Sequence, residues 1–176
     1  GIVPIVLGGG HDLTVPMYKG LESVGRPMNL VTVDPRLDFG GDPSVVSSRN
    51  HMNSVVMHEP NYLFDYANVG HQGYLTDPDT LELLERLQFE AIRLGALLQN
   101  IQHVEPVVRN ADLVTIDVAS IRASDHPAST HASPNGMTAE HFCQLSRYVG
   151  MSDRMLATGF FEHNPDLDDR GRGAHL

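Results

Sequence analysis

The chain has 176 residues, of which 41% are hydrophobic, and a formal net charge of -10. This length is typical of one domain, so we expect residues 1–176 to form a single domain around one packed core. The negative charge argues against a nucleic-acid partner, because phosphate backbones are bound by clustered Lys and Arg, and no apolar run approaches the roughly 18 residues of a membrane-spanning helix.

Along the chain, apolar runs of strand length alternate with segments of helical periodicity. The predicted strands are residues 2–7, 28–34, 68–72, 112–118 and 155–160. The predicted helices are residues 14–24, 79–99, 105–110 and 138–149. Because the strands are apolar on both faces and are separated by helices, we predict an α/β fold with a parallel sheet that helices cover on both sides.

The two ends of the sequence and its single cysteine bear on the natural context of the chain. Strand 2–7 begins almost at the first residue, and residues 170–176 look like the start of a helix. We therefore expect the chain to be a fragment of a longer domain, truncated at both ends. Because Cys143 is the only cysteine, the chain has no internal disulfide, which fits the cytoplasmic location that we predict.

Ionisable side chains follow four of the predicted strands at the point where each strand ends. In chain order they are His11, Asp34, Asp38, Asp117 and Glu162. Ligands of open α/β sheets bind at the carboxyl ends of the strands, so we expect these side chains to meet at one edge of the sheet. A single Asp after a strand is usually a turn or cap residue, but the repetition at four strands favours a shared binding site.

Three carboxylates and one imidazole are ligands that suit a divalent cation such as Mn²⁺. Asp34 and Asp38 lie close together after one strand, so a single loop can place both around one ion. His11 and Asp117 would complete the coordination from neighbouring strands. The alternative is that these acids are spread along the sheet edge and solvated, and the spacing alone does not decide between the two.

Five short segments resemble, in the same order, the motifs of the ureohydrolase superfamily (arginase, agmatinase and formimidoylglutamase). The segments are residues 8–11, 34–38, 117–119, 133–138 and 162–165. The corresponding family motifs are Gly-Gly-x-His, Asp-Ala-His-x-Asp, Asp-x-Asp, a glycine-rich loop that leads into a helix, and Glu-x-Asn-Pro. The resemblance covers most of residues 3–165 and is weak between residues 58 and 110.

The resemblance implies an arginase-like, three-layer α/β/α fold with a mostly parallel sheet. It also implies a chemistry, because family enzymes use two Mn²⁺ ions to ionise a bridging water, which then attacks a guanidino or formimino carbon. The implied partner is a small guanidino or formimino substrate, and family members usually assemble into homo-oligomers.

The ligands of one family ion are retained in this sequence, and two ligands of the other ion are replaced. The retained set is His11, Asp34, Asp38 and Asp117. At the other ion, the positions of a His and an Asp hold Arg36 and Ala119. An arginine guanidinium has no lone pair to give a metal, and alanine has no ligand atom. We therefore expect at most one Mn²⁺, with a metal-free site as the alternative.

Three further side chains receive roles from the resemblance. The guanidinium of Arg36 would stand in for the lost ion by pairing with Asp34 or Asp117, unless it points into solvent. His51 lies at the spacing from Asp34 at which arginases carry a His that assists proton transfer; the alternative is a surface-loop residue. Glu162 matches the Glu that holds the substrate guanidinium; the alternative is a salt bridge at a strand end.

We therefore predict a ureohydrolase-family C–N hydrolase that acts on a linear guanidino or formimino compound with at most one Mn²⁺. The main alternative is a non-catalytic member of the family that serves as a binding or assembly subunit. A third possibility is an unrelated α/β binding domain with an acidic sheet edge. The substrate is not identified by the sequence, because loops 42–52 and 119–137 match no single branch of the family.

Overall fold

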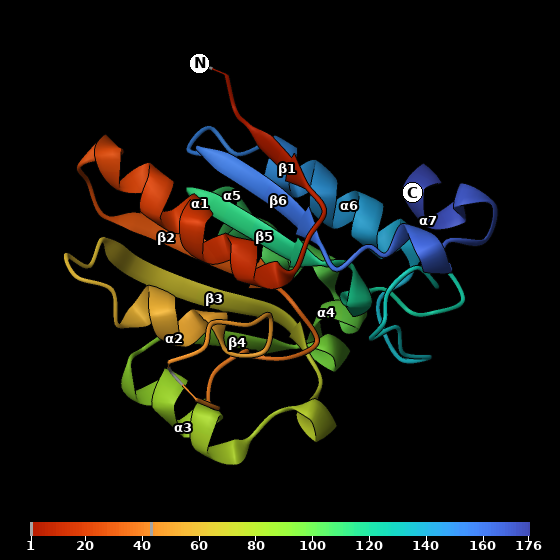
Figure 1. The fold of residues 1–176 in the computed structure, drawn as a ribbon, viewed down its shortest axis with the longest axis horizontal. Coiled ribbons are helices and arrows are strands. Elements are labelled where there is room, and N and C mark those ends of the chain that lie inside the picture. The colour runs from red at the N-terminus through yellow and green to blue at the C-terminus, as the bar shows by residue number, and fades with distance from the viewer. Residues whose placement is uncertain (1, 43) are drawn as a thin grey trace.

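The computed structural model describes residues 2–42 and 44–176. In this part of the chain, six strands form one sheet with the order β1-β6-β5-β2-β3-β4, and every neighbouring pair is parallel (Figure 1). The strands are β1 (Ile5–Leu7), β2 (Met28–Val33), β3 (Leu63–His71), β4 (Glu90–Arg93), β5 (Leu113–Asp117) and β6 (Ala157–Phe161). The predicted parallel sheet is confirmed.

Helices cover both faces of this sheet and produce three layers (Figure 1). One face carries α1 (Thr14–Leu21), α2 (His51–Val56) and α3 (Pro78–Arg86). The other face carries α4 (Leu94–Gln99), α5 (Glu105–Arg109) and α6 (Ala139–Gly150). The short helix α7 (Arg172–His175) follows β6. Within the described residues, no helix has the length and apolar character needed to cross a membrane.

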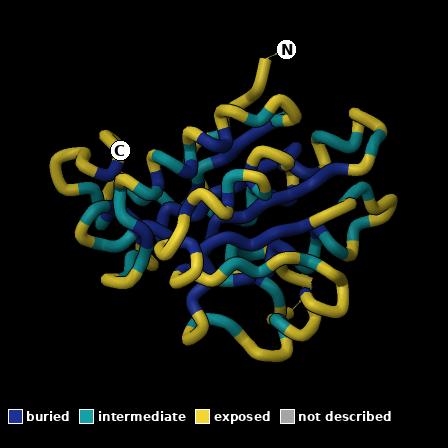
Figure 2. The backbone as a smooth tube through the Cα atoms, turned by 180° about the vertical axis from the view of Figure 1, so that it is seen from behind, coloured by how far each residue is buried: buried dark blue, intermediate teal, exposed yellow. Residues whose placement is uncertain are grey.

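The central strands send alternate side chains into two apolar layers. Leu30 and Leu113 pack with α1, α2 and α3, whereas Val31 and Val114 pack with α4, α5 and α6. Figure 2 shows long buried stretches of backbone running through the middle of the molecule. Because side chains two and four positions apart in a strand point the same way, Asp117 lies on the Leu113 face, toward α1 and α2.

The predicted helix over residues 79–99 is wrong in its middle, where the structure has α3, then β4, then α4. Gln88 adopts a left-handed backbone with φ of 60°, which a continuing α-helix does not allow. Ala91 then packs against one apolar layer and Ile92 against the other, as in a strand. The leucines on both sides of this short strand have helical spacing, so the pattern predicted one continuous helix.

Within the described residues, β1 is an edge strand with exposed apolar side chains. It pairs with β6, and Ile5 and Leu7 are 63% and 76% exposed. An apolar run does not distinguish a strand at the centre of a sheet from one at its edge, because the difference depends on pairing partners that are distant in sequence.

The glycine-rich loop at residues 133–138 packs closely against the segment that follows β5. A Cβ atom on Gly136 would come within 2.5 Å of the Arg122 backbone nitrogen, so the two backbones can approach only at a glycine. Two residues later, Thr138 Oγ1 accepts a 3.2 Å hydrogen bond from His141 N and caps α6. The glycine and the cap together set the direction in which the chain enters α6.

Candidate metal centre

The turn after β1 brings His11 to the carboxyl edge of the sheet. Gly8 and Gly9 have φ of 89° and 79°, in a region that other residues rarely adopt. Gly8 N donates a 2.8 Å hydrogen bond to the Phe160 carbonyl, which keeps the turn attached to β6. The chain then enters a short 3₁₀ helix, His11–Leu13, and the His11 side chain is fully buried at its start.

The loop after β2 supplies Asp34 and Asp38. Asp34 Oδ1 accepts a 2.7 Å hydrogen bond from Arg36 N, which turns the chain directly after the strand. Asp38 has φ of 52°, an uncommon and strained conformation for a residue other than glycine. Its carbonyl accepts a 3.2 Å hydrogen bond from Met52 N, which ties the loop to α2. Both carboxyl groups end up buried.

The adjacent strands β5 and β6 supply Asp117 and Glu162. Asp117 Oδ1 accepts a 2.6 Å hydrogen bond from Ala119 N. Glu162 has a left-handed backbone with φ of 67°, and its Oε1 accepts a 2.9 Å hydrogen bond from His11 N. Glu162 forms no ion pair with any described residue, which excludes the alternative of a strand-end salt bridge within that part of the chain.

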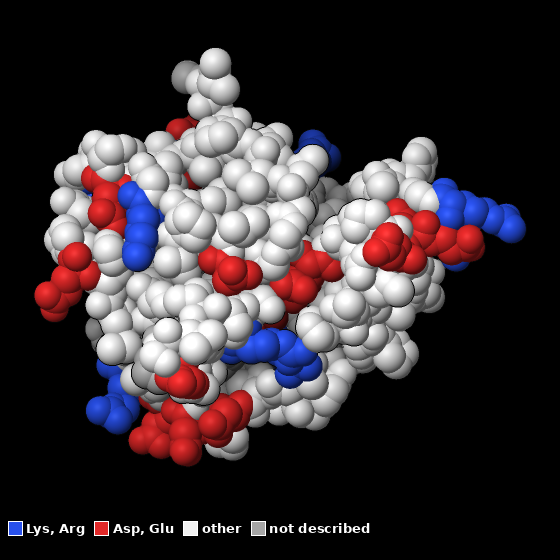
Figure 3. All heavy atoms as spheres, in the orientation of Figure 1, with Lys and Arg blue, Asp and Glu red and all other residues white. Residues whose placement is uncertain are grey.

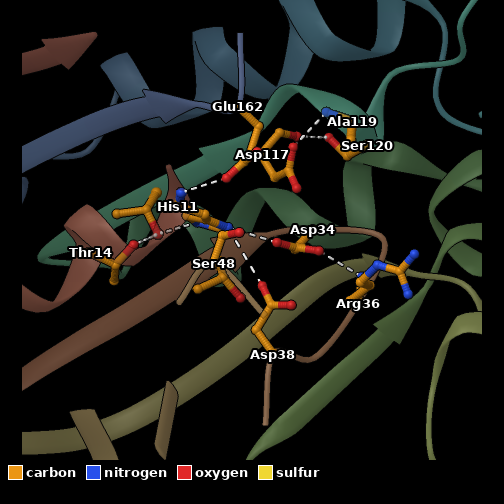
Figure 4. A network of polar contacts seen from close by, with 12 residues as sticks. His11, Thr14, Asp34, Arg36, Asp38, Ser48, Asp117, Ala119, Ser120 and Glu162 are labelled. Carbon is orange, nitrogen blue, oxygen red and sulfur yellow. Dashed lines mark hydrogen bonds and ion pairs between the residues drawn. The ribbon is translucent and has the colours of Figure 1, made fainter. Parts of the chain in front are cut away.

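The side chains that the sequence singled out as metal ligands lie in one buried cluster (Figure 4). His11 Nδ1 lies 2.7 Å from Asp34 Oδ2 and 3.7 Å from Asp38 Oδ2. Candidate ligand atoms of His11, Asp34 and Asp117 lie within 4.8 Å of one another, and so do those of His11, Asp38 and His51. The strand ends thus gather imidazole and carboxyl groups in one small volume.

Burial raises the pKa values of the carboxyl groups in this cluster. The pKa of Asp117 is raised to about 8, mainly by burial. Burial and a neighbouring carboxylate raise the pKa values of Asp34 and Asp38 well above the usual range. Burial also lowers the pKa of His11 to about 4, so its imidazole is neutral near pH 7, which is the form that binds metals. A divalent cation would favour the ionised carboxylates, so this donor set fits one.

Two threonines that the sequence did not single out hold the His11 ring. Thr115 Oγ1 lies 3.0 Å from His11 Nε2, and the Thr14 hydroxyl donates to Thr115 Oγ1 at 3.1 Å. This contact leaves Nδ1 facing the carboxyl groups, and outer hydrogen bonds of this kind orient metal-binding histidines. The sequence could have identified Thr115 as a site residue, because it stands two residues before Asp117 in a strand and therefore lies on the same face.

At the two replaced family positions, neither Arg36 nor Ala119 offers a metal ligand. Figure 4 shows the Arg36 side chain pointing away from Asp34. Its guanidinium forms no ion pair among the described residues, so the expected pairing with Asp34 or Asp117 is wrong. The reason is the tight turn, in which the Arg36 backbone bonds to Asp34 while its side chain leaves in another direction.

On the surface, acidic and basic side chains lie next to each other near the middle of the face seen in Figure 3.

His51 is fully buried beside His11, which excludes the alternative of a surface-loop residue. The two ring centroids are 4.6 Å apart. His51 Nδ1 lies 3.7 Å from Asp38 Oδ2 and 3.3 Å from the Ser48 carbonyl oxygen, while Nε2 has no hydrogen-bond partner among the described residues. Burial lowers the pKa of His51 well below its usual value. Because the ring has no exposed surface, it cannot exchange protons directly with bulk water in this conformation.

The fold and the site together define an α/β protein with a candidate metal centre at the carboxyl edge of a parallel sheet. A model of the arginase family matches residues 1–176, so the chain belongs to the arginase family. Membership in this family confirms the resemblance found in the sequence motifs.

Curated relatives and solved structures agree with this membership. The chain is 20% identical over 184 residues to a formimidoylglutamase of Geobacillus thermodenitrificans and 22% identical over 178 residues to one of Geobacillus sp. (strain WCH70). These matches cover 100% and 96% of the chain but 57% and 54% of the relatives, so the chain spans little more than half their length.

The solved structures confirm the arginase-like fold. Formiminoglutamase of Trypanosoma cruzi, crystallised with Mn²⁺, matches with a TM-score of 0.88 at 19% identity, covering 98% of this chain and 61% of that one. Arginase of Bacillus cereus matches with a TM-score of 0.80 at 15% identity, covering 98% and 67%.

Proposed function

We propose that the chain hydrolyses a C–N bond in a small, linear guanidino or formimino compound, with at most one Mn²⁺ bound. The observation that carries this proposal is the convergence of His11, three buried carboxyl groups and Glu162 at the carboxyl ends of four parallel strands. Family membership and the formimidoylglutamases among the relatives support it.

The candidate ligands of the ion are His11, Asp34, Asp38 and Asp117. A bound ion would acidify a water molecule and so supply the hydroxide for attack on the substrate carbon. Thr115 keeps His11 Nδ1 turned toward the carboxyl groups. Because the pKa values of the three Asp carboxyl groups are raised, a cation competes with protons for these groups.

In this proposal, Glu162 holds the cationic end of the substrate. One of its carboxylate oxygens accepts the His11 N–H, which fixes the side chain, and the residue remains partly exposed at the site. A guanidino or formimino group carries planar N–H donors on carbon, and a carboxylate pairs with such donors through charge-assisted hydrogen bonds. Glu162 therefore positions the carbon for attack without taking part in the bond change.

The same structure gives a specific reason for the alternative, a non-catalytic member of the family. Arg36 and Ala119 leave the site without ligands for a second ion, and a water on one ion is less acidified than a water between two. Such a protein would keep one ion for structure or regulation and act as a binding or assembly subunit.

Ion content and turnover together test the proposal. The chain is incubated with Mn²⁺, desalted and analysed by elemental mass spectrometry, and it is then assayed for urea or formamide release from guanidino and formimino compounds. We expect about one ion per chain and a turnover that Asp38→Asn lowers by at least about a hundredfold. Asp153→Asn, which changes an exposed carboxylate far from the cluster, is the matched control. One ion without turnover would contradict the hydrolase and support the non-catalytic alternative.

A further inference from the structure

We propose that His51 is a metal ligand, so that this chain holds its single ion through two imidazoles, those of His11 and His51, with the Asp38 carboxylate between them. The inference rests on the proposed function only in assuming one ion in this pocket. The inference goes beyond the proposed function, because the family resemblance assigns His51 to proton transfer and gives the retained ion only one imidazole ligand, His11.

The distances favour this three-residue group. Asp38 Oδ2 lies 3.7 Å from His11 Nδ1 and 3.7 Å from His51 Nδ1. Ligand atoms about 2.1 Å from a common ion lie roughly 3 to 3.5 Å from one another. The two distances from Asp38 would therefore need to shorten by only a few tenths of an ångström, and the ligand atoms of the two rings already lie within 4.8 Å of each other.

The His51 ring also lacks the partners that a buried imidazole normally has. It is fully buried, its Nε2 has no hydrogen-bond partner among the described residues, and its Nδ1 makes only a long 3.3 Å contact with the Ser48 carbonyl. Buried polar atoms are nearly always paired, because an unpaired one costs free energy. An ion beside Asp38 would give His51 Nδ1, whose contacts with Asp38 and Ser48 are long, a strong interaction that the protein alone does not provide.

The backbone holds Asp38 and His51 in this relation. Asp38 keeps a strained left-handed conformation, and its carbonyl accepts a hydrogen bond from Met52 N in the first turn of α2, one residue after His51. Strained residues persist where the surrounding structure fixes them, often at ligand sites. The strain and the hydrogen bond together aim the Asp38 carboxylate at both rings.

The chemistry of the site is consistent with His51 supplying an imidazole in place of the one that is missing at position 36. The chain has lost the imidazole of the second ion, because Arg36 stands in its place. His51 offers an imidazole next to that of His11. With His51 added, the candidate ligands of the ion would include two imidazoles, and imidazole ligands suit ions such as Co²⁺ and Zn²⁺ well. A nitrogen bound to an ion has no lone pair for a proton, so His51 bound in this way does not transfer protons through that atom.

Binding of Co²⁺ alone, followed by visible absorption, tests the assignment. We expect His51→Asn to weaken Co²⁺ binding by roughly a hundredfold or more, and Asp38→Asn to do the same, since losing a ligand should exceed the tenfold to hundredfold effect of outer-shell changes. His71→Asn removes another buried histidine, on β3 and outside the cluster, and should leave Co²⁺ affinity unchanged. Circular dichroism confirms that each variant is folded.

A second measurement needs no substitution. Pulsed electron paramagnetic resonance of Mn²⁺ bound to the wild-type chain, prepared with isotope-labelled histidine, counts the coordinated imidazole nitrogens. Two nitrogens support the proposal. One nitrogen, an unchanged Co²⁺ affinity in folded His51→Asn, or no ion bound to the wild-type chain would overturn it. If one nitrogen is counted and substrate is turned over, the proposed hydrolase activity is supported and His51 is not a ligand. If two nitrogens are counted without turnover, His51 is a ligand and the proposed hydrolase activity is contradicted.

Discussion

Asp117→Asn tests whether the cluster prefers a neutral group over a carboxylate when no metal is bound. The pKa of Asp117 is raised to about 8 in the folded chain, against about 3.9 for an unfolded aspartate. The folded state therefore holds this proton more tightly than the unfolded state. The resulting stabilisation is fully present below the unfolded pKa and is lost as pH rises through the folded pKa. Asparagine does not titrate, yet its amide oxygen can still accept the hydrogen bond from Ala119 N.

The size of the effect follows from the pKa. One proton contributes about 1.4 kcal/mol for each pH unit between the two pKa values. From about pH 5 to about pH 8, the wild-type chain should therefore lose about 4 kcal/mol of unfolding free energy relative to Asp117→Asn. In a domain of this size, that loss corresponds to a relative decrease in Tm of roughly 8 to 16 °C.

Thermal unfolding of both chains in a metal chelator, followed by circular dichroism across this pH range, measures the difference. Comparing the two chains removes the contribution of shared groups that do not interact with Asp117, including His11 and His51, whose lowered pKa values change stability on the acid side. Parallel stability curves between the wild-type chain and the variant would refute the reasoning, because they would mean that Asp117 carries no extra proton in the folded state.

Three further substitutions have expected outcomes. Gly136→Ala should lower the unfolding free energy by about 1 to 3 kcal/mol in denaturant titration, because its Cβ would meet backbone atoms at 2.5 Å, whereas Gly150→Ala meets nothing within 4 Å and should be neutral. Thr115→Val should weaken Mn²⁺ binding about tenfold to a hundredfold by calorimetry, since it releases the His11 ring; equal affinity would exclude an orienting role. Asp112→Asn should remove part of the loss of stability at acid pH, because two arginines lower the pKa of Asp112, and its stabilisation disappears as pH falls through that lowered value. Unchanged acid unfolding would count against this last expectation.

The architecture was predictable from the sequence because its signals are local and repeated. Buried strands such as Met28–Val33 and Leu113–Asp117 are apolar on both faces, which is typical of a parallel sheet. In a parallel sheet, the carboxyl ends of these strands lie at the same edge. The same geometry predicts that His11 and Asp34 lie near each other. The two-residue period of a strand would also have predicted that Thr115 lies on the same face as Asp117, and therefore near the site.

The features that the sequence did not reveal depend on contacts between distant segments. The exposure of β1 depends on which strands pair with it, and the break at Gln88 is a single backbone angle within an otherwise helical pattern. The direction of the Arg36 side chain follows from how the Asp34 turn closes. The burial of His51 depends on α2 packing over the end of β2, which no spacing in the sequence specifies.

The hydrogen bond from His11 N to Glu162 Oε1 joins residues 151 positions apart and has a consequence for folding. The cluster also joins His11 to Asp117, so its parts come from nearly the whole length of the chain. Contacts of such long range form late, because the intervening chain must first be ordered. The site therefore does not exist in any partly folded segment. An ion that binds it acts on the equilibrium of the entire chain, and metal should slow amide hydrogen exchange throughout the sheet and not only in the loops that touch the ion.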